Sequence, residues 1–256
     1  MNLITAGILG IIEGITEFLP ISSTAHMVLA SDLMHLAQSE FVKSFEIIIQ
    51  LGAILAVIVL YGRKYIRDWA CIKKIIIAFI PTGILGFIFY KTIKSMIGNQ
   101  NIILWALFLG GLGIIFFELV YRKKEVYEGD ISVITNGQAF VIGLCQSVSM
   151  IPGISRSAIT VISGLAMGIH RKAIVEFSFL LAVVTMVAAT VYDFSKNFNS
   201  FSVDQFDYLA IGFIVSFVTA ILAIKFMVKY IKNHTFMAFG VYRIVIAVLF
   251  YLFIIR

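Results

Sequence analysis

Long uninterrupted apolar runs dominate the hydrophobic pattern of this chain. Six of them approach or reach the length of about 17–25 residues with which a helix crosses a bilayer. They lie at residues 45–62, 74–89, 102–121, 174–194, 208–228 and 236–255. They do not show the strict alternation of lipid-facing barrel strands, and peptide groups in lipid must be satisfied within the segment, so each run is predicted to be a transmembrane helix.

Two further apolar segments, 3–34 and 139–169, are interrupted near their middles. Pro20 and the hydroxyl run 22–24 interrupt the first, and Pro152, Gly153 and the polar run 155–157 interrupt the second. Proline removes a helical hydrogen bond and opposes the preceding turn, while glycine permits a sharp reversal. Each segment is therefore predicted to be a re-entrant pair of half-helices.

The order of these elements repeats along the chain. A broken segment and three spans fill residues 1–121, a polar cytoplasmic linker covers 122–138, and another broken segment and three spans fill 139–256. Because three crossings are an odd number, the second half inserts upside down, and the two breaks meet near the midplane. The predicted fold is an all-α polytopic membrane protein with six spans and two re-entrant segments in an inverted repeat.

Composition and charge agree with a membrane protein. The chain is 61% hydrophobic and 13% charged, with a mean hydropathy of +1.01, which excludes an ordinary soluble domain. The positive-inside rule predicts that most basic residues are cytoplasmic and both termini are outside. The predicted cytoplasmic set is Arg63, Lys64, Arg67, Lys73, Lys74, Arg122, Lys123, Lys124, Arg171, Lys172, Lys225, Lys229 and Lys232, and the opposite set is Lys43, Lys91, Lys94, Lys196 and Arg256.

The basic loops, the two cysteines and the start of the chain each add one expectation. The basic loops are short and adjoin span ends, so a nucleic-acid partner is not expected. Cys71 and Cys145 lie in dissimilar segments, and no disulfide is expected between them. The start of the chain lacks the charged residues of a secretory signal and is expected to stay in the mature protein.

The first interruption begins with two glutamates. In a helix, Glu13 and Glu17 are four residues apart and share a face, with Cβ atoms about 5–6 Å apart. Two carboxylates so close favour a hard divalent cation such as Mg²⁺ or Ca²⁺. The alternative is that one glutamate is protonated or bonded to neighbouring backbone.

Hydroxyls and a histidine follow the glutamates. Ser22, Ser23 and Thr24 come just after Pro20, where a new half-helix begins and its positive end attracts anions. His26 is three residues after Ser23 and four after Ser22, so either serine can share its helix face, as a nucleophile does with its base. The alternative is that the hydroxyls are ordinary helix caps.

The second interruption supplies a cation. Gly153 lets backbone approach a ligand, Arg156 offers a planar fork for phosphate, and Ser155, Ser157 and Thr160 add hydroxyls. The alternative for the arginine is a structural ion pair with Glu13 or Glu17. Carboxylates, a nucleophile with a base, and an arginine together are typical of phosphoryl transfer.

Other charges in the apolar segments are expected to be less central. Arg243 is a further intramembrane cation in the last run. Glu46, Glu118 and Glu176 lie at span ends, where an interfacial location is expected.

The chain resembles the bacterial undecaprenyl-diphosphatases, also called bacitracin-resistance phosphatases, over its full length. The resemblance rests on the glutamate pair, FLPISSTAH at 18–26, FEIIIQLGAILAV from Phe45, PGISRSAIT at 152–160 and EFSFLLAV from Glu176. The chain departs from the family in having Ala25 and Ala158 where glycine is usual.

The resemblance implies a membrane enzyme that converts undecaprenyl diphosphate into the monophosphate lipid carrier for cell-wall synthesis, and so confers bacitracin resistance. It implies a divalent cation at Glu13 and Glu17, Ser23 as nucleophile, His26 as acid or base, and Arg156 holding the diphosphate. Glu17 is thus also expected in the catalytic set, and Ser22, Thr24, Gly153, Ser155, Ser157 and Thr160 are expected around the substrate.

The resemblance also predicts partners and a location. The partners are the polyprenyl diphosphate substrate and membrane lipids, and a homodimer is left open. The location is the bacterial inner (plasma) membrane, with the site opening outward.

Two other classes remain open from the residues alone. Inverted repeats with midplane polar sites also suit a transporter or flippase for an anionic lipid or small anion, which needs no nucleophile. A phosphatase of the type-2 phosphatidic acid family is disfavoured because its lysine, arginine and paired-histidine motif is not found.

Overall fold

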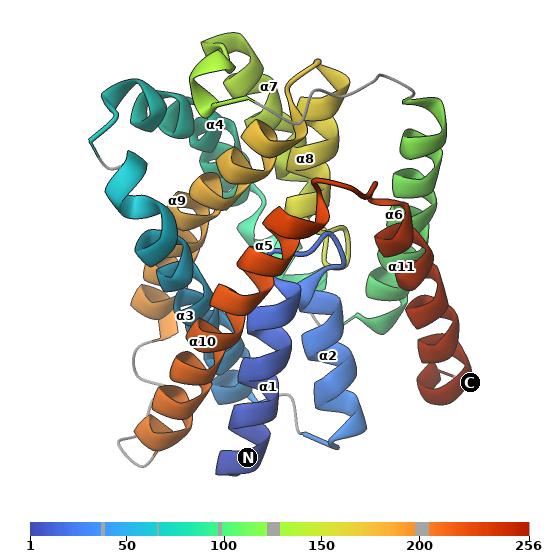
Figure 1. Cartoon of the computed structure of the whole chain (residues 1–256). Helices are drawn as coiled ribbons and strands as arrows, with labels where there is room; N and C mark the ends of the chain where they lie inside the picture. Colours follow the sequence, from blue (N-terminus) through green and yellow to red (C-terminus); the bar gives the residue numbers. More distant parts are fainter. Residues whose placement is uncertain (37–38, 66, 97–98, 122–128, 198–204, 256) are drawn as a thin grey trace.

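The computed structural model of the chain describes residues 1–36, 39–65, 67–96, 99–121, 129–197 and 205–255, and within these ranges it is helical without strands. Figure 1 shows helices running up and down through one bundle. Five are long and apolar enough to cross a membrane: α3 (Glu40–Tyr65), α4 (Trp69–Ile88), α6 (Gln100–Val120), α9 (Arg171–Asn197) and α10 (Phe206–Tyr230). A short helix, α5 (Tyr90–Met96), lies between α4 and α6.

The sixth predicted span differs from these five. Residues 236–255 form α11 (Met237–Phe250), which continues as one π-helical turn, η5 (Tyr251–Ile255). Its apolar part, Met237–Phe253, is shorter than that of each of the other five helices. At 1.5 Å per residue such a helix spans about 26 Å, somewhat less than a hydrocarbon core of about 30 Å.

Both interrupted segments are broken at their prolines. The first forms α1 (Leu3–Thr16) and α2 (Ser23–Leu33), and the second forms α7 (Asn136–Gln146), a 3₁₀ turn η2 (Ser147–Met150) and α8 (Arg156–Ala166). In Figure 1, α1 and α2 occupy the lower part of the bundle and α7 and α8 the upper part. Both termini lie toward the lower end of that view.

The second broken segment begins earlier than its apolar pattern suggests. It was expected to start at residue 139, but α7 starts at Asn136 because Thr135 and Gln138 form a reciprocal capping box. The predicted linker 122–138 lies partly outside the described residues, which omit 122–128. Its end holds a 3₁₀ turn, η1 (Ile131–Val133).

The first helix of each broken segment packs against a long helix from the other half of the sequence. α1 packs most extensively on α10, α7 packs on α4, and the long α3 contacts both α9 and α10. The contact between α1 and α10 is close: a Cβ added to Gly14 would overlap both the Thr219 side chain and the carbonyl of Ser216.

Aromatic side chains fill the interior, and large apolar side chains also cover the outside. Phe18, Phe177 and Phe179 are fully buried, whereas Phe87 and Phe116 are 72% and 69% exposed on the spans. A soluble monomer rarely exposes apolar surface so widely, while a bilayer accepts it. The chain is a multi-pass membrane protein.

Acidic residues near span ends are buried in protein contacts. Glu118 pairs with Arg171 at 2.9 Å and accepts the amide of Phe236, and Glu176 accepts the hydroxyl of Tyr65 at 2.6 Å. Both glutamates are nearly inaccessible. Both are held in packed ion pairs and hydrogen bonds rather than exposed to solvent, and their expected interfacial position stays a prediction.

The two cysteines are free, as expected.

Candidate active site

The two helices that follow the breaks begin in the same way. Ser22 and Ser155 have positive φ angles of 72° and 79°, and each hydroxyl accepts the amide three residues later, at Ala25 and Ala158. Such N-caps satisfy one of the free amides at a helix start. Ser22 and Ser155 therefore act as helix caps in this structure. Their expected role in binding substrate stays a prediction.

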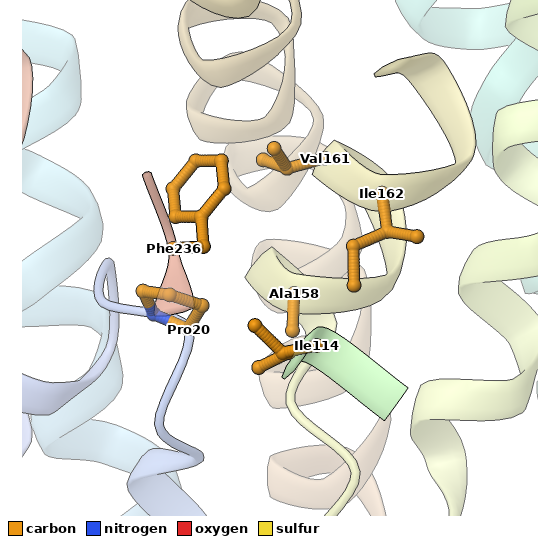
Figure 2. Close-up of a pocket in the computed structure, with 6 residues that line it drawn as sticks. All are labelled: Pro20, Ile114, Ala158, Val161, Ile162 and Phe236. Carbon is orange, nitrogen blue, oxygen red and sulfur yellow. The ribbon is translucent and has the colours of Figure 1, made fainter. Parts of the chain in front are cut away.

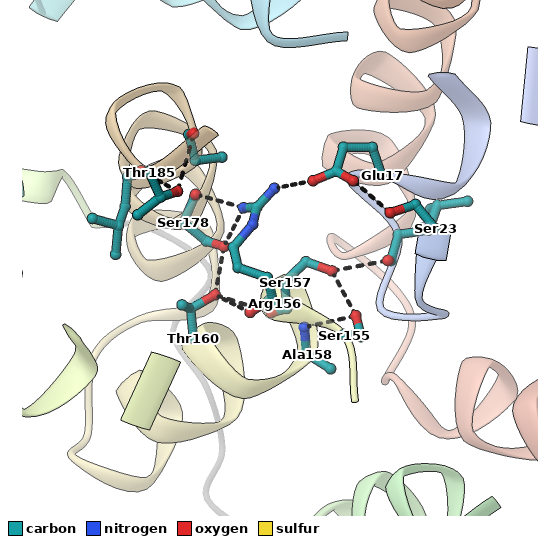
Figure 3. A network of polar contacts seen from close by, with 12 residues as sticks. Glu17, Ser23, Ser155, Arg156, Ser157, Ala158, Thr160, Ser178 and Thr185 are labelled. Carbon is teal, nitrogen blue, oxygen red and sulfur yellow. Dashed lines mark hydrogen bonds and ion pairs between the residues drawn. The ribbon is translucent and has the colours of Figure 1, made fainter. Parts of the chain in front are cut away.

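Ser23 and Arg156 are the first residues of these two helices and meet at one carboxylate. The Ser23 hydroxyl donates to Glu17 Oε2 at 2.6 Å, and Arg156 Nη2 donates to Glu17 Oε1 at 2.7 Å (Figure 3). The side chains of Glu17 and Arg156 are only 3% and 11% exposed. The ion pair considered as an alternative for Arg156 is thus present, and it joins the two breaks.

Glu13 lies one turn before Glu17, and its carboxylate has no hydrogen-bond partner among the described residues. The amide of Glu17 bonds the carbonyl of Glu13 at 3.0 Å, so the helical turn continues and both carboxylates share a face. Glu13 is fully buried, and neither of its carboxylate oxygens has a hydrogen-bond partner. An isolated buried carboxylate is costly, so this site calls for a proton or a cation.

Arg156 is held from its other side by α9. Its Nη1 donates to the carbonyl and the hydroxyl of Ser178, at 2.8 and 3.3 Å, and the Ser178 hydroxyl contacts the Thr160 hydroxyl at 2.6 Å. Thr160 donates to the carbonyl of Arg156 at 2.9 Å, so Ser178 must donate to Thr160, and the bonds close a ring. The Nε of Arg156 is buried and lacks an acceptor.

The other predicted residues of the second break also make contacts within the protein. Ser157 donates to the carbonyl of Leu19 at 2.8 Å and contacts the Ser155 hydroxyl at 3.1 Å. Gly153 has a φ of +100°, which glycine adopts without strain. Thr24 is half-buried on the first turn of α2.

His26 differs from the expected serine and histidine pair. Its Nδ1 lies 2.8 Å from the carbonyl of Ser22, which can only accept, so Nδ1 carries a proton. Its Nε2 lies 2.9 Å from the hydroxyl of Tyr242, and the two rings stack at 5.6 Å. The acceptor for the Ser23 proton in this structure is Glu17 rather than His26.

Sequence reasoning missed three residues that support the site. Ser178 and Tyr242 had no assigned role, and Arg243 was noted as an intramembrane cation only. The available signal was chemical: a hydroxyl two residues after Glu176, and a tyrosine and arginine together in an apolar helix. Their partners lie on other elements, so spacing along the chain does not reveal them.

A small apolar pocket with about 160 Å³ of empty space lies beside the breaks. Figure 2 shows the residues that line it, which are Pro20, Ile114, Ala158, Val161, Ile162 and Phe236. These are apolar, so the pocket offers no side-chain donor for a phosphate group.

The fold and this site define a class: a multi-pass membrane protein in which two broken helices bring two carboxylates, a serine and an arginine together. Comparison with known proteins identifies the family. The model of a family described as bacitracin resistance protein BacA matches residues 6–249. This chain belongs to that family.

Curated relatives agree over almost the whole chain. A protein named undecaprenyl-diphosphatase from Sulfurihydrogenibium sp. is 49% identical over 98% of this chain and 99% of its own length. Proteins of the same name from Aquifex aeolicus and Persephonella marina are 50% and 48% identical, covering 96% and 99% of this chain and 96% and 100% of their own.

Proposed function

We propose that the chain is an undecaprenyl-diphosphatase, which removes one phosphate from undecaprenyl diphosphate and so recycles the lipid carrier for cell-wall synthesis and confers bacitracin resistance. Its relatives carry this name along nearly their full lengths. One observation in the site carries the proposal: among the described residues, the buried oxygens of Glu13 have no hydrogen-bond donor, and the buried Nε of Arg156 has no acceptor. A divalent cation and a phosphate group supply these two partners together.

The residues present fit a divalent cation. Two buried carboxylates face a single guanidinium, and hard cations prefer carboxylate oxygens. Among the described residues, no group of three or more His, Cys, Asp or Glu side chains could hold a metal. Glu13 and Glu17 would therefore hold Mg²⁺ or Ca²⁺ together with water and phosphate oxygens, an arrangement that Mg²⁺ favours. When bound, the cation would neutralise charge on the transferred phosphate.

Ser23 is the proposed nucleophile and Glu17 the group that receives its proton. The 2.6 Å hydrogen bond already directs the hydroxyl proton at Glu17 Oε2. Ser23 Oγ forms a bond to the terminal phosphorus, the bridging phosphorus–oxygen bond breaks, and undecaprenyl phosphate leaves. Water then hydrolyses the phosphoserine and releases phosphate.

The remaining groups hold substrate or move a second proton. Arg156 binds the phosphate through its unpartnered Nε, and the starts of α2 and α8 direct free amides and positive dipole ends at the anion. Ser22, Thr24, Gly153, Ser155, Ser157 and Thr160 shape this cradle. Because the Ser23 hydroxyl donates to Glu17, His26 transfers a different proton: it protonates the leaving oxygen or accepts a proton from the attacking water.

The finer architecture of the proposal is an inverted repeat of six spans and two re-entrant segments, with halves 1–121 and 139–256. Two likenesses between the halves support it. α2 and α8 are both 11 residues long and start at a positive-φ serine cap. In addition, α1 packs on α10 of the second half, and α7 packs on α4 of the first.

The proposed location is the bacterial inner membrane with both termini and the site opening outside. The excess of Lys and Arg at one set of span ends supports this orientation. The polyprenyl tail stays in the bilayer, against the apolar outer surface of the spans.

The test is phosphate release from undecaprenyl diphosphate by the purified protein, with Mg²⁺, with Ca²⁺ and with a chelator. We expect release that depends on the cation, and a loss of at least about 100-fold in Ser23→Ala and Arg156→Ala. Ser163→Ala is the matched control, because that α8 hydroxyl bonds only back to the carbonyl of Thr160 and lies two turns from Arg156.

Full activity in Ser23→Ala would contradict the nucleophile and leave a binding or transport role for the site. Labelled prenyl diphosphate in vesicles then measures transfer between leaflets in the same variant. Activity that is unchanged by chelator would contradict the cation at Glu13 and Glu17.

A further inference from the structure

Arg243 is the largest fully buried side chain of the described chain, and it has no role in the chemistry derived above. It lies on α11 with 0% exposure. Its five N–H groups donate to five backbone carbonyls, at distances from 2.7 to 3.4 Å. Within the described residues no carboxylate pairs with it, so main-chain dipoles alone compensate its charge.

The five carbonyls come from three separate parts of the chain. Ala106 and Leu107 belong to α6. Pro20 belongs to the first break, and Gly153 and Ile154 belong to the second. One planar guanidinium therefore holds the main chains of both breaks against the same point of a spanning helix.

The guanidinium approaches the main chain of α6 at Gly110, which has no side chain. A Cβ on Gly110 would overlap Nη2 of Arg243, so no other residue type fits there without moving the side chain. A Cβ on Gly113, one turn further along the same helix, meets nothing within 4 Å. The two glycines form a matched pair for perturbing or sparing the contact.

The bonded carbonyls lie very close in sequence to the reacting groups. Pro20 is three residues before Ser23, and Ile154 is two residues before Arg156. A shift of either break therefore moves the serine or the arginine relative to Glu17. A misplacement of about 1 Å in such a site costs about 100-fold in rate.

We propose that Arg243 is a positioning residue, which fixes the first break relative to the second so that Ser23 and Arg156 meet the same phosphate group. This inference rests on the proposed phosphatase function. Arginine suits the task because it offers five donors in a fixed plane, whereas lysine keeps the charge but offers three donors from one flexible atom.

The experiment is a double-mutant cycle on substrate binding. The affinity of a methylene-bridged prenyl diphosphonate, which cannot be hydrolysed, is measured for wild type, Arg243→Lys, Arg156→Ala and the double variant. If Arg243 acts by placing Arg156, Arg243→Lys weakens binding about 10-fold or more in the wild type and has little effect once Arg156 is absent. A purely structural contribution weakens binding equally in both backgrounds and overturns the proposal.

The glycine pair gives a second measurement that keeps the Arg243 side chain. We expect Gly110→Ala to lower kcat/KM about 10- to 100-fold, and Gly113→Ala to leave it near the wild-type value. Equal effects of the two alanines overturn the proposal. If neither Arg243→Lys nor Gly110→Ala folds, as judged by thermal unfolding, Arg243 is a core support and the proposal also fails.

The same measurements separate this inference from the proposed function. A wild-type protein that neither binds the diphosphonate nor releases phosphate contradicts the phosphatase function itself. A wild-type protein that does both, with additive effects in the cycle, contradicts only the role of Arg243.

Discussion

Replacing Glu13 by glutamine tests whether a cation belongs in this site. Both carboxylate oxygens of Glu13 are buried without a partner, so Glu13→Gln loses no hydrogen bond within the protein. It removes a charge whose uncompensated burial costs on the order of 3–5 kcal/mol. Allowing for the cost of burying an amide, we expect the metal-free variant to be more stable than metal-free wild type by about 1–3 kcal/mol.

The same substitution is expected to remove the response to cation. Magnesium at about 100 times its Kd stabilises a protein that binds it by about 2.7 kcal/mol, and the variant should gain little of this. At about 2–4 °C per kcal/mol for a chain of this size, each difference amounts to several degrees in Tm. The difference in Tm between Glu13→Gln and wild type should therefore shrink or change sign when the chelator is replaced by Mg²⁺.

The assay is thermal unfolding in detergent, followed by helical circular dichroism, in chelator, in Mg²⁺ and in NaCl of matched ionic strength. The NaCl sample controls for general screening. A wild-type Tm that is the same in chelator and Mg²⁺, together with a variant that is equally stable in both, would refute the reasoning. Glu13 would then carry a proton.

Three further substitutions test other contacts. Tyr242→Phe removes only the hydroxyl at His26 Nε2, and we expect a roughly 2- to 10-fold loss of kcat with a shifted pH–rate profile; an unshifted profile would contradict a role for this contact. Ser178→Ala removes the hydroxyl that accepts a hydrogen bond from the Arg156 guanidinium, and KM should rise several-fold while kcat changes less. A change in kcat alone would contradict a role of this contact in substrate binding. Gly14→Ala places a Cβ inside the α10 contact and should lower the unfolding free energy by about 1–3 kcal/mol, whereas Gly7→Ala, with its nearest neighbour 4.0 Å away, should not; equal Tm values would be inconsistent with the packing.

The pattern of the sequence was enough to predict a helical membrane protein with long apolar helices and two interrupted segments. An apolar run long enough to cross a bilayer is a property of consecutive residues, and so is a proline that interrupts one. The breaks occur where Pro20 and Pro152 have polar or glycine neighbours, whereas Pro81 alone leaves α4 continuous, and the shared face of Glu13 and Glu17 follows from helix geometry. Helix starts were less predictable, because a capping box in a polar stretch moved the start of α7 to Asn136.

Only the tertiary structure decided how the candidate site is joined. Glu17 and Arg156 are 139 residues apart, and no periodicity in either segment indicates that one carboxylate bonds both Ser23 and the arginine. Spacing left both Ser22 and Ser23 open as partners of His26, because residues three or four apart on a helix are neighbours. The break between α1 and α2 instead turns the first residue of α2 back toward Glu17.

The same distinction applies to Arg243. The sequence determined that a cation lies in an apolar helix, where it needs a compensating group. It did not determine which group, because the five acceptors are main-chain carbonyls, and every residue carries one. Such acceptors have no signature in the sequence, and only the packing of α11 against α6 and the two breaks brings them to the guanidinium.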